Sequence, residues 1–145
     1  MFNRMLFCIL AVLSATSLFA EPFLLVSLPD EEHLAVFEIN SRTGELTHIR
    51  DHKIESDPGP MSVSQDGNTL FVSLRNYGGL ASYAIDHETS GLKHLSTIKA
   101  DRDPAYHWQD HSGQWLITAY YHTGRVSVHA VDKMGVLNQE AAFFG

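Results

Sequence analysis

The stretch NTLFVSLRNYGGLASYAID, residues Asn68–Asp86, places two short apolar runs on either side of a Tyr-Gly-Gly turn. Its pattern recurs at a fixed distance in both directions along the chain. Residues 26–28 (VSL) correspond to residues 72–74 (VSL) and then to residues 118–120 (TAY), and both steps are 46 residues long. A period of this length identifies a repeat protein.

Each repeat contains four predicted strands separated by turn residues. In the unit that begins at Met61, the runs MSVS, TLFVSL, LASYAID and LKHLSTIKA are rich in apolar and β-branched residues. Between the first two runs, Asp66-Gly67 is a dipeptide that tolerates the positive φ of a tight hairpin turn. Four antiparallel strands in a unit of roughly 40–50 residues are typical of a β-propeller blade, and residues 21–145 show no helical spacing.

The predicted fold class is therefore all-β, built from propeller blades of four antiparallel strands. Runs such as LFVSL and VSVHAV carry small or apolar residues on both faces, as expected for a blade that packs between two others. Residues 21–145 hold about 2.7 repeats, whereas closed propellers have roughly four to eight blades. We expect the chain to be the N-terminal part of a longer propeller, without its C-terminal blades.

The first twenty residues have the composition of a secretory signal peptide. Arg4 supplies a positive start, MLFCILAVL an apolar core, and ATSLFA a small-residue exit that ends at Ala20. The apolar run is shorter than the roughly 20 residues that span a bilayer. We predict cleavage after Ala20, which leaves residues 21–145 as one secreted or periplasmic domain with no membrane segment and no cysteine.

The net charge of this domain limits the classes of partner that it is expected to bind. The formal charge of the whole chain is −7, and removal of residues 1–20 takes away one basic residue and no acidic one. Nucleic-acid binding depends on clustered Lys and Arg side chains, which an acidic chain of this kind does not offer. Nucleic acid is therefore excluded as a predicted partner.

Four segments carry a resemblance to a known family. They are TGELTHI, PGPMSVSQDGNTLFVSLRN, YAIDHETSGL and DHSGQWLITAYYHTGRVSVHAVD. They resemble the opening blades of the lactonase family, the seven-bladed propellers that include bacterial propeller-type 6-phosphogluconolactonase and fungal muconate-lactonising enzyme. The resemblance covers residues 23–145 and implies about 2.7 of seven blades, with a small-molecule lactone or sugar-acid ligand as partner.

The resemblance also implies where the catalytic residues lie. The family's His, Arg and Glu occur after the third blade, in a Pro-His-x-His-like segment, a Gly-Pro-Arg-His motif and an Asn-Glu. This chain ends before all three, so the catalytic residues are expected beyond Gly145. The implied activity is a 6-phosphogluconolactonase-like carboxylic ester hydrolase, and the alternative is a non-catalytic extracellular propeller that binds a ligand or a protein.

Blade geometry predicts which present residues line the mouth of the channel. The first strand of a blade lies nearest the axis, and antiparallel pairing places its start beside the end of the second strand. The substrate-binding candidates at these positions are Arg75, Tyr106, His107 and Tyr121. Tyr106 departs from the His that lactonases often carry there.

Two of these candidates keep a structural alternative. The Arg75 guanidinium is suited to a carboxylate or phosphate, but it could equally form a surface ion pair. Tyr121 could hydrogen-bond a ligand, although a blade-to-blade contact is the favoured interpretation.

Metal and cofactor sites are not predicted. His107, His111 and His122 are the nearest candidate ligands, but no acidic or thiol partner completes a spaced set. The glycine pair Gly78-Gly79 has no strand-to-helix context for a phosphate loop. No nucleophile-elbow motif supports a Ser-His-Asp arrangement.

Overall fold

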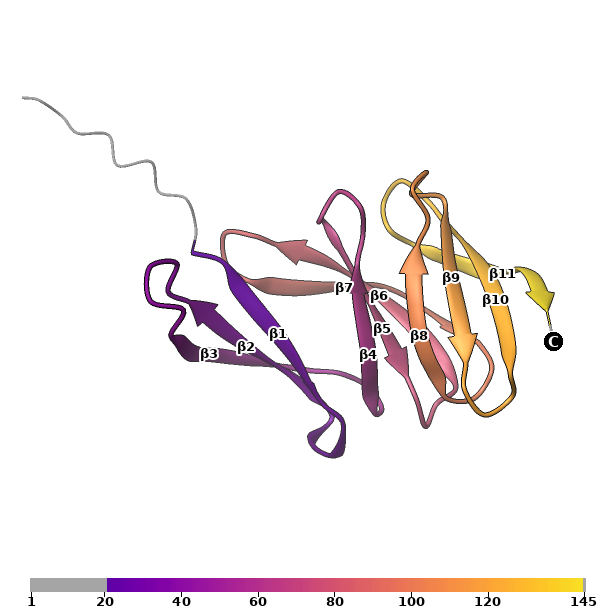
Figure 1. Ribbon diagram of the computed structural model, residues 1–145, viewed down its shortest axis with the longest axis horizontal. Helices are drawn as coiled ribbons and strands as arrows, with labels where there is room; N and C mark the ends of the chain where they lie inside the picture. Colours follow the sequence, from indigo (N-terminus) through magenta and orange to yellow (C-terminus); the bar gives the residue numbers. More distant parts are fainter. Residues whose placement is uncertain (1–20, 145) are drawn as a thin grey trace, which may run out of the picture.

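The computed structural model describes residues 21–144 and contains three antiparallel sheets packed in a row (Figure 1). The strands are β1 (Phe23–Leu28), β2 (His33–Ile39), β3 (Leu46–Lys53), β4 (Pro58–Val63), β5 (Thr69–Leu74), β6 (Gly79–Asp86), β7 (Gly91–Lys99), β8 (Pro104–Gln109), β9 (Trp115–Tyr120), β10 (Arg125–Val131) and β11 (Leu137–Phe144). In each sheet, the order of the strands follows the order along the chain. The predicted all-β class is confirmed.

The 46-residue period is the spacing between equivalent blades. Val72 on β5 pairs with Met61 on β4, and Thr118 on β9 pairs with His107 on β8, so both hold the same place in the second strand of a blade. Strands β4 to β7 and strands β8 to β11 form two complete four-stranded blades. The first sheet, β1-β2-β3, has three strands, and its β1 corresponds to the second strand of the other two.

The predicted hairpin turns are present at the predicted glycines. Gly67 and Gly113 have φ values of 79° and 72°. These angles lie in the left-handed region, where a residue without Cβ has no steric penalty. The Asp66 side chain accepts a 3.0 Å hydrogen bond from the Asn68 N–H, which closes the turn between β4 and β5.

Strand β5 of the middle sheet is buried on both faces, as the run LFVSL predicts. All six residues of β5 are buried, and alternate side chains point to opposite faces. One cluster lies between the first and second sheets, and a second lies between the second and third. They contain Leu34, Ile54, Leu70, Val72, Leu74, Ala81 and Tyr83, and Phe71, Leu80, Ile98, Leu116, Val131 and Leu137, respectively.

Helical structure in the described residues is limited to η1 (Pro29–Glu31), a single 3-10 turn. No helix within residues 21–144 is long and apolar enough to cross a membrane. The predicted signal peptide, residues 1–20, lies outside the described residues and stays a prediction.

Candidate ligand-binding rim

Loops from the second and third blades meet at one end of the molecule and enclose a cavity. Because neighbouring strands are antiparallel, the start of β4 and the end of β5 lie at the same end of their sheet. The same relation holds for β8 and β9. The cavity has a volume of about 550 Å³. Its lining residues are Asp57, Arg75, Asn76, Arg102, Asp103, His122 and Thr123.

Asp103 lies at the centre of this rim and contacts both blades. The Arg75 Nε donates a 2.7 Å hydrogen bond to Oδ1 of Asp103, and the His122 Nε2 lies 2.9 Å from Oδ2. The hydrogen bond from Arg75 holds the pKa of Asp103 below its usual range, with smaller contributions from the charges nearby. Asp103 is therefore an ionised carboxylate with one oxygen directed to each blade.

Two arginines and two aspartates line the cavity: Arg75, Arg102, Asp57 and Asp103. Besides Arg75, Arg102 lines the cavity with an exposed side chain. Within residues 21–144, the guanidinium of Arg102 makes no hydrogen bond or ion pair of its own, although its charge helps to lower the pKa of Asp103. Guanidinium groups match the planar geometry of carboxylate and phosphate oxygens.

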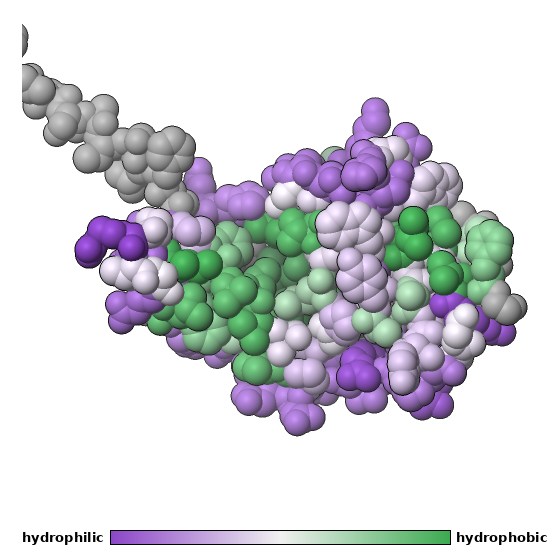
Figure 2. Space-filling model, viewed as in Figure 1, coloured by the Kyte–Doolittle hydropathy of each residue, from purple (hydrophilic) through white to green (hydrophobic). Residues whose placement is uncertain are grey.

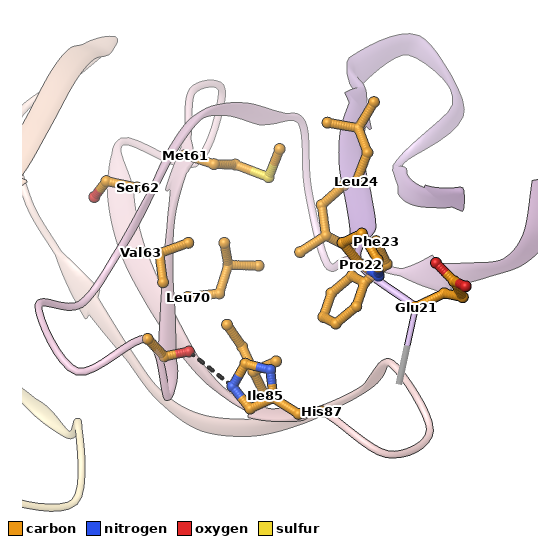
Figure 3. Close-up of a pocket in the computed structure, with 12 residues that line it drawn as sticks. Glu21, Pro22, Phe23, Leu24, Met61, Ser62, Val63, Leu70, Ile85 and His87 are labelled. Carbon is orange, nitrogen blue, oxygen red and sulfur yellow. Dashed lines mark hydrogen bonds between the residues drawn. The ribbon is translucent and has the colours of Figure 1, made fainter. Parts of the chain in front are cut away.

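A second cavity, between the first and second sheets, has a different chemistry. It measures about 620 Å³ and lies beside the unpaired edge of β1. Figure 3 shows Met61, Val63, Leu70 and Ile85 on one side of this groove and Phe23 on the other. Hydrophobic residues also gather over this part of the surface in Figure 2. Among residues 21–144, no Arg or Lys lines this groove, in contrast to the rim cavity.

The family of the chain follows from a comparison with family models. The model described as "Lactonase, 7-bladed beta-propeller" matches residues 20–144. The chain belongs to the lactonase family. The resemblance seen in the sequence is thereby confirmed. No curated protein sequence matches the chain.

Solved structures similar to this chain share its fold at low sequence identity. The periplasmic gluconolactonase PpgL of Pseudomonas aeruginosa has a TM-score of 0.76 at 19% identity, over 83% of this chain and 36% of that one. A putative 6-phosphogluconolactonase from Bacteroides uniformis has a TM-score of 0.74 at 18% identity, over 84% and 37%. Hydrazine synthase of Kuenenia stuttgartiensis reaches 0.54 at 16% identity, over 90% and 38%. The chain thus spans little more than a third of the length of these proteins.

Of the four predicted binding residues, only Arg75 lines the rim cavity. His107, on β8, is 1% exposed, and its side chain contacts β4. Its Nε2 donates to the carbonyl oxygen of Pro60 at 3.1 Å, and its Nδ1 therefore accepts from the Ser62 hydroxyl at 2.6 Å. Burial lowers the pKa of His107 to about 4. The His107 imidazole is a neutral link between two blades, and both its nitrogens are hydrogen-bonded.

The two tyrosines are exposed and lie outside the cavity lining. Tyr106 is 61% exposed on β8, on the same strand face as Trp108. Tyr121 is 83% exposed, and its ring packs edge-on against that of His122 at a centroid distance of 5.5 Å. Their predicted roles at the channel mouth stay predictions.

Within residues 21–144, no group of three or more His, Cys, Asp or Glu side chains is arranged to hold a metal ion.

Asp103, which contacts Arg75 and His122 at the rim, is not among the binding residues predicted from the sequence. A signal was present: Asp57-Pro58 and Asp103-Pro104 are separated by the 46-residue step. Each pair places a carboxylate immediately before the inner strand of a blade. Both aspartates line the cavity.

Proposed function

We propose that the protein is an exported lactonase-like hydrolase that opens a lactone or related cyclic ester of a sugar acid. The observation that carries the proposal is a cavity with two arginines at one rim of a lactonase-family propeller. The structural likeness to a protein described as a periplasmic gluconolactonase supports the same class of substrate. The proposed partner is a small molecule, and no cofactor is assigned.

The proposed reaction is hydrolytic ring opening. A general base, supplied by blades beyond Gly145, activates a water molecule that attacks the lactone carbonyl carbon. The bond from that carbon to the ring oxygen breaks, and the ring oxygen takes up the proton that the general base removed from water and leaves as an alcohol. Arginine side chains at the rim hold the acid group of the ligand or stabilise the oxyanion that forms at the carbonyl. Arg75 is our first candidate for this role.

A titration of released acid tests the activity. The complete propeller is incubated with D-glucono-1,5-lactone and D-glucaro-1,4-lactone at constant pH, and the base consumed is compared with that of a heat-inactivated sample. Hydrolysis above the spontaneous rate supports the proposal. Spontaneous rates for both lactones, together with tight binding of the ring-opened acids by calorimetry, would instead indicate a non-catalytic binding propeller.

Export is tested separately from activity. The composition of residues 1–20 predicts cleavage after Ala20. Mass spectrometry of the protein from the periplasm or medium should find an N-terminus at Glu21. An intact Met1 terminus in the cytoplasmic fraction would contradict export and leave the hydrolase proposal standing.

A further inference from the structure

The side chain of Arg75 lies against a glycine of the neighbouring inner strand. A Cβ atom at Gly59, on β4, would lie 2.6 Å from Cδ and 2.7 Å from Cγ of Arg75. Real Cβ atoms do not approach other carbons so closely, so any larger residue at position 59 would displace the arginine stem. The missing side chain at Gly59 therefore gives Arg75 its path across β4.

In this position, one edge of the Arg75 guanidinium is bound by an aspartate, and the other edge is available to a ligand. The Nε group is held by Asp103 at 2.7 Å, and the charge of Asp57 adds to the attraction. Within residues 21–144, neither terminal Nη group of Arg75 donates a hydrogen bond to the protein. The side chain is 47% exposed and lines the rim cavity. Both Nη groups are thus available to a ligand.

The next blade provides an internal comparison. At the equivalent positions, 46 residues further along the chain, Ala105 stands in place of Gly59 and Tyr121 in place of Arg75. With a Cβ present at position 105, Tyr121 does not line the cavity and is 83% exposed. Only the blade with glycine in its inner strand brings the side chain at this position into the cavity.

We propose that Gly59 is a positioning residue for ligand recognition. It holds Arg75 across the inner strand so that the two Nη groups face an acid group, carboxylate or phosphate, of the bound ligand. The inference rests on the proposed function for the class of ligand. It goes beyond that function by assigning recognition to a pair of residues, of which only Arg75 touches the ligand.

The test uses the complete propeller and five variants: Gly59→Ala, Arg75→Ala, Arg75→Lys, the double variant Gly59→Ala/Arg75→Ala, and Gly91→Ala. The last is a matched control, because an added Cβ at Gly91 would meet only the Thr89 hydroxyl oxygen at 3.0 Å and the Asp86 Cβ at 3.7 Å. Calorimetry measures binding of D-glucarate and inorganic phosphate, which separates the two kinds of acid group. D-glucitol serves as the neutral probe.

Gly59→Ala and Arg75→Ala should each weaken binding of the acid probe by roughly 10- to 100-fold, as expected for a lost hydrogen bond to a charged group. Every variant should bind the neutral probe as the wild-type protein does. The Gly91→Ala variant should also bind the acid probes with wild-type affinity. The double variant should bind like Arg75→Ala alone, because Gly59 acts through Arg75. Arg75→Lys should restore part of the affinity.

Three results would overturn the inference. The first is that the wild-type protein binds neither acid measurably. The second is that a folded Gly59→Ala variant keeps its affinity for the acid. The third is that Gly59→Ala weakens acid binding as much in the Arg75→Ala variant as in the wild-type protein. If Gly59→Ala alone fails to fold, the double variant should fold, since it lacks the arginine atoms that the added methyl group would meet. Failure of that rescue also counts against the inference.

The outcome is separable from that of the proposed function. Lactone hydrolysis that persists while Gly59→Ala leaves acid affinity unchanged would remove only the positioning role. Acid binding that depends on Gly59, in a protein that hydrolyses no lactone, would retain the positioning role and remove the hydrolase.

Discussion

Arg75 and Asp103 form an ion pair, 2.7 Å from Nε to Oδ1, that joins the second blade to the loop entering the third. The side chains are 47% and 26% exposed. Ion pairs with this much solvent contact contribute about 0–1 kcal/mol to stability, because water screens the charges. The pair therefore orients the guanidinium more than it stabilises the fold.

Replacing Arg75 by Ala should separate stability from recognition. We expect the free energy of unfolding, measured with urea, to fall by less than about 1 kcal/mol. Binding of an acidic ligand, measured by calorimetry, should weaken by about 1.5–3 kcal/mol. A large loss of stability with unchanged affinity would identify Arg75 as a structural residue.

His107 should make the protein less stable in acid. Its pKa is about 4 in the folded state, against an ordinary value of 6.5. Below pH 6.5 the unfolded chain takes up a proton that the folded chain does not, so the free energy of unfolding falls until the pH reaches about 4. The loss amounts to about 3 kcal/mol, and urea unfolding at a series of pH values measures it.

A variant taken from the repeat itself is the control for this effect. Met61 holds the place in the second blade that His107 holds in the third. His107→Met should flatten the pH profile between 6.5 and 4. Some slope should remain, because burial also lowers the pKa of His129. An unchanged profile would show that His107 is not the titrating group.

Much of the fold was predictable because it depends on local patterns. Alternating apolar residues and turn residues such as Gly67 repeat at 46 residues, and this period alone places Val72 and Thr118 on equivalent strands. The sequence also predicts that β5 is covered on both faces, and it is.

The rim was harder to predict because its contacts join residues far apart in the chain. Arg75 and Asp103 are 28 positions apart, and no local pattern pairs them. Likewise, the period aligns His107 with an apolar residue, but only the packing of β8 against β4 shows that the imidazole is buried. The contact between Gly59 and the Arg75 side chain depends on the backbone geometry of β4 and β5, and no pattern in the sequence indicates it.

Gln109 should be the more important member of a glutamine pair that links the blades. It is 4% exposed. Its Oε1 accepts from the Gln65 N–H at 2.9 Å, and its Nε2 donates to the Gly113 carbonyl at 2.9 Å. Gln109→Leu leaves both backbone groups without these partners and should cost about 1–3 kcal/mol for each group that stays buried.

Gln65→Ala is the matched comparison. The exposed Gln65 side chain donates only one bond, of 3.2 Å, to the Gln109 carbonyl. Loss of this bond should lower the free energy of unfolding by no more than about 0.5–1.5 kcal/mol, because water can replace the donor. Equal destabilisation of the two variants in urea unfolding would argue against the buried role of Gln109.

Residues 21–145 expressed alone should self-associate. On the outer face of the third sheet, Tyr106, Trp108, Trp115 and Ile117 are between 37% and 61% exposed. The apolar groove beside the unpaired edge of β1, between the first and second sheets, is a further open apolar surface (Figure 1). Exposed apolar patches and open strand edges favour association between copies.

Light scattering should detect oligomers of residues 21–145 that grow with concentration, and Ile117→Glu on the exposed face should reduce them. A monodisperse monomer with a sharp, cooperative melt would show that the open blade faces are stable in water.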